Sequence, residues 1–202
     1  MSTDPSATSV VGGFFLRVLL WLVPLLAAWY WAREWLSLPV AWVAEQAMRG
    51  FFSYWVTGSE LEGTTQTLLT ALEVRAPDGR VGELAPTANI LSYAYGTPFA
   101  AALLLAVDRQ GWWWKLPLAG LALIPFQATS VCFTWLMQVA VLAAPETAAQ
   151  TGFDAWDMNF FAAGYQLGFL LLPTLMPVLI WFALDRRVVA ALLIESALER
   201  DD

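Results

Sequence analysis

Four long runs of apolar residues, separated by short polar segments, dominate the pattern of this chain. The runs cover residues 11–31, 93–107, 116–143 and 160–184. A helix needs about 20 mostly apolar residues to cross a hydrocarbon core of about 30 Å, and aromatic residues at its ends suit the membrane interface. The pattern therefore predicts four transmembrane helices, with the lipid bilayer as the solvent for most of the protein.

The first apolar run has a cleaved signal peptide as its alternative interpretation. No lysine or arginine precedes the run, Arg17 lies within it, and the aromatic residues 29–31 stand where a small-residue cleavage site would be expected. We therefore expect residues 11–31 to form an uncleaved membrane anchor.

Residues 36–56 form a further apolar segment that polar residues interrupt. Glu45, Arg49 and Ser53 recur at a spacing of four, which places them on one stripe of a helix. A fifth transmembrane helix would bury Glu45 and Arg49, whereas an amphipathic helix on the membrane surface would not. The surface helix is the favoured interpretation, and a crossing helix stays open.

The segment 58–89 is the longest polar stretch of the chain. Residues 64–74 are rich in threonine and leucine, residues 76–79 form a turn signal, and an extended pattern resumes at 80–84. We predict a small β-hairpin outside the bilayer. Because two strands alone are marginally stable in water, we expect it to pack on the surface helix or on a partner.

The predicted fold is an all-α membrane protein with four transmembrane helices, one interfacial amphipathic helix and one extracytoplasmic β-hairpin. Residues 145–159 are interpreted as an acidic loop. The loop between the second and third runs carries Arg109 and Lys115, arginines 186 and 187 follow the fourth run, and residues 145–159 contain no basic residue. Since cytoplasmic loops are enriched in lysine and arginine, the N-terminal residues 1–10 and the tail 185–202 are predicted to be cytoplasmic.

Composition supports the membrane interpretation and restricts the chemistry. Hydrophobic residues make up 59% of the chain and charged residues 13%, against about 25% charged residues in a soluble domain. The net charge of −7 argues against a nucleic-acid partner, because phosphate backbones attract basic surfaces. The bilayer is the partner that the composition predicts.

Few residues of this chain are suited to catalysis or metal binding. There is no histidine, and Cys132 is the only cysteine, which excludes an intrachain disulfide and the commonest general base. Cys132 is interpreted as a structural filler, Lys115 as an interfacial anchor, and Asp154 with Asp157 as solvated loop acids. We therefore expect no catalytic residue, no metal site and no cofactor.

The third run carries a polar stripe, because Gln127, Ser130, Thr134 and Gln138 are spaced by three and four residues. Such a stripe must meet other helices or water. Interhelical hydrogen bonding is the favoured interpretation, and a polar lining for a substrate path is the alternative, weakened by the absence of any ionisable group in the stripe.

Gly164 and Gly168 on the fourth run, with Gln166 between them, form a small-xxx-small pattern that permits close approach of helices. We expect a contact within the same bundle, with a docking face for a partner as the alternative.

Three features of this sequence are distinctive. They are the order of the parts described above, the entry to the second run, Asn89-Ile90-Leu91-Ser92-Tyr93-Ala94-Tyr95-Gly96-Thr97-Pro98, and the late Gly164-Tyr165-Gln166. The whole chain resembles the exosortase H-associated membrane proteins, small bacterial inner-membrane proteins. The resemblance implies an accessory role beside an exosortase, a membrane transpeptidase that processes sorting signals. Exosortases resemble one another in a Cys, Arg and His set, and this chain has no histidine, so it is not the sorting enzyme itself.

Three hypotheses for function follow. The first is a non-enzymatic accessory protein of the bacterial inner membrane, partnered with an exosortase. The second is a small transporter or channel subunit that uses the polar stripe of the third run. The third, an intramembrane enzyme, is the least supported, because no pair of nucleophile and base can be assembled from this sequence.

Overall fold

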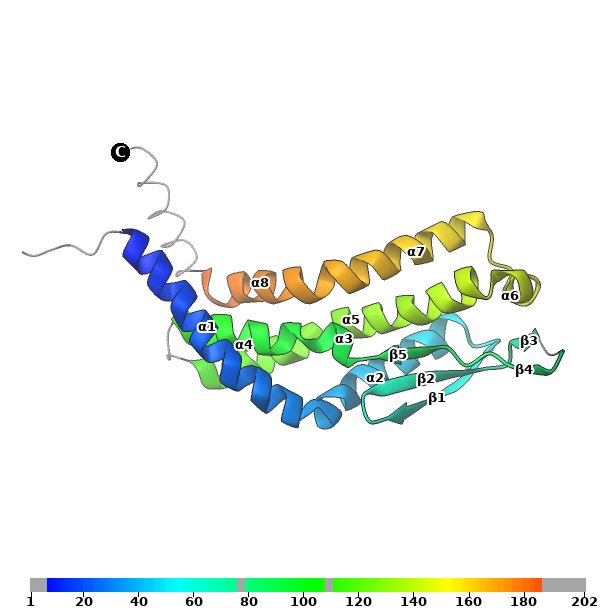
Figure 1. The fold of residues 1–202 in the computed structure, drawn as a ribbon, viewed down its shortest axis with the longest axis horizontal. Helices are drawn as coiled ribbons and strands as arrows, with labels where there is room; N and C mark the ends of the chain where they lie inside the picture. Colours follow the sequence, from blue (N-terminus) through cyan, green and yellow to red (C-terminus); the bar gives the residue numbers. More distant parts are fainter. Residues whose placement is uncertain (1–6, 76–78, 108–110, 187–202) are drawn as a thin grey trace, which may run out of the picture. The chain divides into compact units, whose positions relative to one another are not determined.

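The computed structural model describes residues 7–75, 79–107 and 111–186, and in these ranges the chain is mostly helical with a small β region (Figure 1). Residues 1–6, the predicted turn residues 76–78, the loop residue Arg109 and the predicted tail from residue 187 onward lie outside the described residues. The chain divides into two compact units. Unit 1 takes residues 1–31, 96–123 and 175–202, and unit 2 takes residues 32–95 and 124–174.

Unit 1 is built from apolar helices. It contains α1 (Ala7–Trp31), α4 (Gly96–Val107), the first part of α5 (Trp112–Met137) and most of α8 (Leu172–Leu184). Its core is formed by small and aliphatic side chains around one tryptophan, namely Val18, Ala102, Leu103, Leu104, Ala106, Ala119 and Trp181. The small residues of α4 allow close packing against α1, which is the most extensive helix pairing in the unit.

Helix α1 leaves most of its apolar surface uncovered. Between residues 12 and 31 only Val18 is buried, and Leu20 and Val23 are 65% and 71% exposed. Water would strongly disfavour so large a continuous apolar surface, whereas hydrocarbon tails would solvate it. The bilayer is therefore the solvent that this helix requires.

The prediction of four transmembrane helices is supported only in part. Two helical segments, Gly12–Trp31 and Trp112–Leu142, are long and apolar enough to cross a membrane, and α7 (Ala155–Leu170) with α8 meets the criterion as one broken span. The predicted second span, 93–107, belongs to a shorter apolar helix that is divided into α3 (Leu91–Ala94) and α4. The described residues thus contain two candidate spans, or three if the broken pair is one span.

The predicted fourth span, 160–184, is interrupted at Leu171. Pro173 explains the interruption, because proline has no N–H to donate and its ring collides with the carbonyl four residues earlier. The hydroxyl of Thr174 donates to the carbonyls of Leu170 and Leu171, at 3.0 and 3.2 Å. A side-chain donor thereby satisfies carbonyls at the break, which makes it tolerable in an apolar environment.

In unit 2, helix α2 (Arg33–Phe51) corrects the boundary of the predicted surface helix. The helix ends at Phe51, a turn follows, and Val56 already opens the first strand, so residues 52–56 are not helical. Ser53 therefore does not belong to the helical polar stripe. Glu45 and Arg49 remain on it and form an ion pair at 3.3 Å. Helix α2 is not among the candidate spans.

The β region of unit 2 is larger than the single hairpin predicted. Strands β1 (Val56–Glu62), β2 (Thr65–Thr70) and β5 (Thr87–Asn89) form an antiparallel sheet in the order β1-β2-β5. The predicted hairpin corresponds to a separate pair, β3 (Glu73–Arg75) with β4 (Val81–Glu83). The turn that the prediction missed joins β1 to β2 at Gly63, where φ is +60° and glycine is favoured.

The predicted acidic loop 145–159 is largely helical. It contains α6 (Ala144–Thr151), which follows the π-helical turn η1 (Gln138–Leu142), and α7 begins at Ala155. Asp154 and Asp157 form a capping box at the start of α7: the backbone N–H of Trp156 and of Asp157 donate to Asp154 Oδ1 at 2.8 and 3.0 Å. These carboxylates are helix caps that satisfy otherwise unpaired backbone donors.

Candidate functional site

The polar stripe of α5 faces the interior of unit 2, as its spacing predicts. Ser130 is 1% exposed, Gln127 6% and Thr134 9%, and Gln138 lies at the end of the stripe on η1. Each position is set by the period of the helix, which returns to the same face every three or four residues. The structure therefore buries three of the four predicted stripe residues on one seam, and the fourth, Gln138, lies half-buried at its end.

Ser130 joins α5 to α7. Its hydroxyl donates to the carbonyl of Gly168 at 2.9 Å and to that of Phe126 at 3.0 Å. An added Cβ on Gly168 would lie 3.1 Å from Ser130 Cα, and one on Gly164 would lie 2.2 Å from Phe133 Cε1. The small-xxx-small pattern is thus a close contact within one chain. Gln166, in contrast, is exposed and is not part of this contact.

Thr134 joins α5 to α3. Its hydroxyl is 2.6 Å from the hydroxyl of Tyr93, and it donates to the carbonyl of Ser130 at 2.8 Å. Tyr93 is 4% exposed, and its ring packs edge-on against Phe169 of α7 at 6.2 Å between centroids. The conspicuous Tyr-x-Tyr-Gly-x-Pro entry therefore contributes a structural tyrosine to the seam.

Gln138 joins the end of α5 to the sheet by a two-point contact. Its amide nitrogen donates to the carbonyl of Thr87 at 2.7 Å, and its amide oxygen accepts from the N–H of Thr87 at 3.1 Å. A carboxamide carries the same donor and acceptor as a peptide group, so this side chain pairs with strand β5 as a neighbouring strand would.

A second glutamine repeats this contact on the other β pair. Gln150 of α6 donates to the carbonyl of Glu73 at 2.7 Å and accepts from the N–H of Glu73 at 2.9 Å, and Glu146 accepts from the N–H of Arg75. The sequence interpretation missed Gln150 and Glu146, because it treated their segment as a loop. Their spacing of four residues was the available signal.

Gln66 of β2 is a buried polar residue that the sequence interpretation also missed. It is 1% exposed, and its amide nitrogen donates to the carbonyl of Ala41 on α2 at 2.9 Å and to Ser59 Oγ on β1 at 2.8 Å. The indole N–H of Trp135 on α5 donates to the Gln66 carbonyl at 3.4 Å. A single residue of the sheet thus contacts both α2 and α5.

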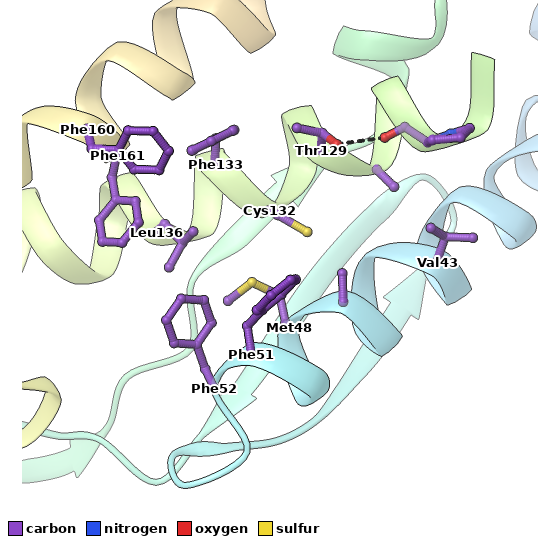
Figure 2. Close-up of a pocket in the computed structure, with 13 residues that line it drawn as sticks. Val43, Met48, Phe51, Phe52, Thr129, Cys132, Phe133, Leu136, Phe160 and Phe161 are labelled. Carbon is purple, nitrogen blue, oxygen red and sulfur yellow. Dashed lines mark hydrogen bonds between the residues drawn. The ribbon is translucent and has the colours of Figure 1, made fainter. Parts of the chain in front are cut away.

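An apolar cavity of about 470 Å³ lies in unit 2 between α2, α5 and the start of α7 (Figure 2). Aromatic and aliphatic side chains form most of its wall, among them Met48, Phe52, Phe133, Leu136, Phe160 and Phe161. Its two polar side chains already donate to main-chain carbonyls, Thr129 to Pro125 at 2.8 Å and Cys132 to Ala44 at 3.6 Å. The cavity is therefore suited to apolar groups.

Unit 1 contains a buried ion pair that gives Lys115, interpreted from the sequence as an interfacial anchor, a specific partner. Its ammonium contacts Asp185 Oδ1, and the two side chains are only 13% and 8% exposed. The ammonium also lies 6.0 Å from the ring centroid of Trp114. Among the residues that the structure describes, no hydrogen-bond partner reaches the buried Asp185 Oδ2, and such a partner would lower the cost of burying the pair.

The chemistry of the seam is that of hydrogen bonding between neutral groups. Its donors are hydroxyls, carboxamides and one indole, and most of its acceptors are main-chain carbonyls. Within the described ranges, no three His, Cys, Asp or Glu side chains are grouped so that they could hold a metal ion. The geometry supports a role in fixing the sheet and α7 to α5.

A family model described as exosortase H-associated membrane protein matches residues 8–188. Neither the comparison with curated proteins nor that with solved structures gives a match.

Proposed function

Because this chain belongs to the exosortase H-associated membrane protein family, we propose that it is a non-enzymatic accessory protein of an exosortase-type sorting system in the bacterial inner membrane. The observation that carries the proposal is the extent of the family match, which includes both the membrane helices and the sheet. An accessory protein needs a membrane anchor and a folded surface for a partner. The apolar helices of unit 1 supply the first, and the sheet supported by α2 and α5 supplies the second.

The hydrogen bonds of the polar stripe on α5 and η1 support this proposal over a transport path. Ser130, Thr134 and Gln138 each contact another element of the same unit, as described above. Groups that line a path must be able to exchange these partners for a substrate. Side chains that bond the scaffold together are not suited to that exchange.

We further propose that both termini are cytoplasmic, that the sheet lies on the outer side, and that α2 lies on the membrane surface. The ion pair of Glu45 and Arg49 on α2 supports the last point. Two charged side chains would be costly to place in the hydrocarbon layer, whereas an aqueous surface accommodates them at little cost. The single cysteine makes the orientation testable. In a Cys132→Ala background, Thr65→Cys should react with a membrane-impermeant maleimide in intact spheroplasts, and Asp202→Cys only after permeabilisation. The reverse pattern contradicts the orientation.

The accessory role is tested by affinity purification of the tagged chain from native membranes in a mild detergent, followed by mass spectrometry. We expect an exosortase to be recovered in excess over its recovery with an unrelated tagged inner-membrane protein of equal abundance. Recovery of the chain alone, under conditions that preserve other inner-membrane complexes, contradicts the proposal.

A further inference from the structure

The three-stranded sheet has two edges, and the structure treats them differently. The order β1-β2-β5 makes β1 and β5 the edge strands, and the β5 edge is contacted by Gln138 at Thr87. Figure 1 shows β1 at one side of the sheet, with β2 next to it and β5 beyond. In the part of the chain that the structure describes, no main-chain hydrogen bond from another element reaches the outer edge of β1. The edge of β3 is likewise contacted by Gln150. The β1 edge is therefore an open edge beside two protected ones.

The hydrogen bonds of β2 show which groups form the open edge. Leu68 N–H donates to the carbonyl of Pro86, and the carbonyl of Thr64 accepts from the N–H of Ile90, both at 2.9 Å. The N–H and C=O groups of even-numbered residues of β2 therefore point to β5, and by alternation the N–H and C=O groups of Thr65 and Thr67 point to β1. They are registered with Glu62 and Glu60, so the N–H and C=O groups of Ser59 and Leu61 on β1 point outward.

A regular stretch of edge is available for pairing. The register is continuous from Gly58 to Glu62, and the only shift lies between Val56 and Gly58. Alternating main-chain donors and acceptors of this kind are complementary to one class of ligand, an extended polypeptide, which adds to the sheet as a further strand.

The charge of β1 narrows the choice of partner. Glu60 and Glu62 are exposed on alternate positions, and β1 contains no basic residue. A second copy of β1 would place these glutamates next to their counterparts, and like charges opposite one another destabilise strand pairing. A strand with lysine or arginine at alternate positions would instead form favourable cross-strand pairs.

We propose that the open edge of β1, from Gly58 to Glu62, binds an extended polypeptide segment with basic side chains at alternate positions by strand addition. The proposal rests on the accessory role and deepens it, since it names the class of segment that the sheet would hold for the sorting system. Specificity comes from Glu60 and Glu62, and affinity comes from the outward main-chain groups of Ser59 and Leu61.

The test uses the purified full-length chain in detergent and a fluorescent ten-residue peptide of alternating lysine and valine, with binding measured by anisotropy. Leu61→Pro removes the outward N–H of residue 61 without removing a hydrogen bond to β2. Leu61→Ala shortens the same side chain but keeps this N–H. We expect Leu61→Ala to bind as the native chain does, and Leu61→Pro to bind about fivefold to tenfold more weakly at an unchanged unfolding temperature. The double variant Glu60→Lys with Glu62→Lys should prefer a glutamate–valine peptide.

Three outcomes overturn the proposal. Equal binding by the Leu61→Pro and Leu61→Ala variants would show attraction by charge without strand addition. Unchanged peptide preference in the double lysine variant would remove the assigned specificity. A dimer in sedimentation that Leu61→Pro dissociates would identify a second copy as the occupant. Because the test needs no exosortase, its failure is distinct from failure of the membrane purification that tests the accessory role.

Discussion

The two units of this chain accommodate their polar groups in opposite ways. Among the described residues of unit 1, the buried charges are those of one ion pair, Lys115 with Asp185, next to a core of apolar side chains. In unit 2, many neutral side chains form hydrogen bonds, and most of their acceptors are main-chain carbonyls. A buried charge is costly when its partner is lost, whereas a neutral bond contributes only about 1 kcal/mol. We therefore expect one substitution in unit 1, at the ion pair, to lower the free energy of unfolding strongly. Single substitutions at the hydrogen-bonding side chains of unit 2 should each lower it only slightly.

The largest expected effect comes from breaking the ion pair of unit 1. Asp185→Ala leaves the Lys115 ammonium buried without its counter-ion and should cost about 3 to 5 kcal/mol of unfolding free energy. The measurement is denaturation of the purified protein in mixed micelles. The matched control is Lys115→Met with Asp185→Leu, which removes both charges and should recover most of the loss. A cost for Asp185→Ala below about 1 kcal/mol would contradict the contrast between the units.

The closest helix contact of unit 2 should give the next largest effect. Gly164→Ala places a Cβ 2.2 Å from Phe133 Cε1, so the ring must move, and overpacking of this kind costs about 1 to 3 kcal/mol.

Gly120→Ala on α5 is the control for this contact, because nothing lies within 4 Å of its Cβ. It should be neutral or slightly stabilising, since alanine favours the helix more than glycine does. In a background of Phe133→Ala, the cost of Gly164→Ala should shrink; equal costs in both backgrounds would show that the ring is not the obstacle.

The glutamine contacts to the strand edges should each be worth less. Gln138→Leu removes both hydrogen bonds to Thr87 and should cost about 1 to 2 kcal/mol, with faster hydrogen exchange of the Thr87 amide. Gln166→Leu makes the same chemical change at an exposed position of α7 and should stay within about 0.5 kcal/mol. Unchanged exchange at Thr87 would mean that Gln138 does not protect this edge in solution.

The smallest effect is expected on the surface of α2. Arg49→Met removes the exposed partner of Glu45 and should cost less than about 0.5 kcal/mol at low salt. Raising the salt concentration should reduce the difference further, because ions screen exposed charges. A cost above about 1 kcal/mol would place this pair with the buried pair of unit 1 and weaken the comparison.

The sequence by itself determined the membrane environment, the position of most helices, and the buried face of α5. These features are local, because about 20 apolar residues suffice to identify a membrane-spanning helix and a spacing of three or four places Gln127, Ser130 and Thr134 on one face. The close approach at Gly164 and Gly168 followed from the same local rule. The break at Leu171 also has a local cause in Pro173, although the pattern alone was interpreted as one continuous span.

Only the tertiary structure decided which distant residues meet. Lys115 pairs with Asp185 across 70 positions, and Gln138 and Gln150 reach strands 51 and 77 positions away. The same holds for the order β1-β2-β5, which leaves one edge open and the other contacted by a glutamine. No local periodicity predicts such contacts, because their partners are far apart in the sequence. They form only when the tertiary arrangement brings the two segments together, and the interactions of both segments then stabilise the contact.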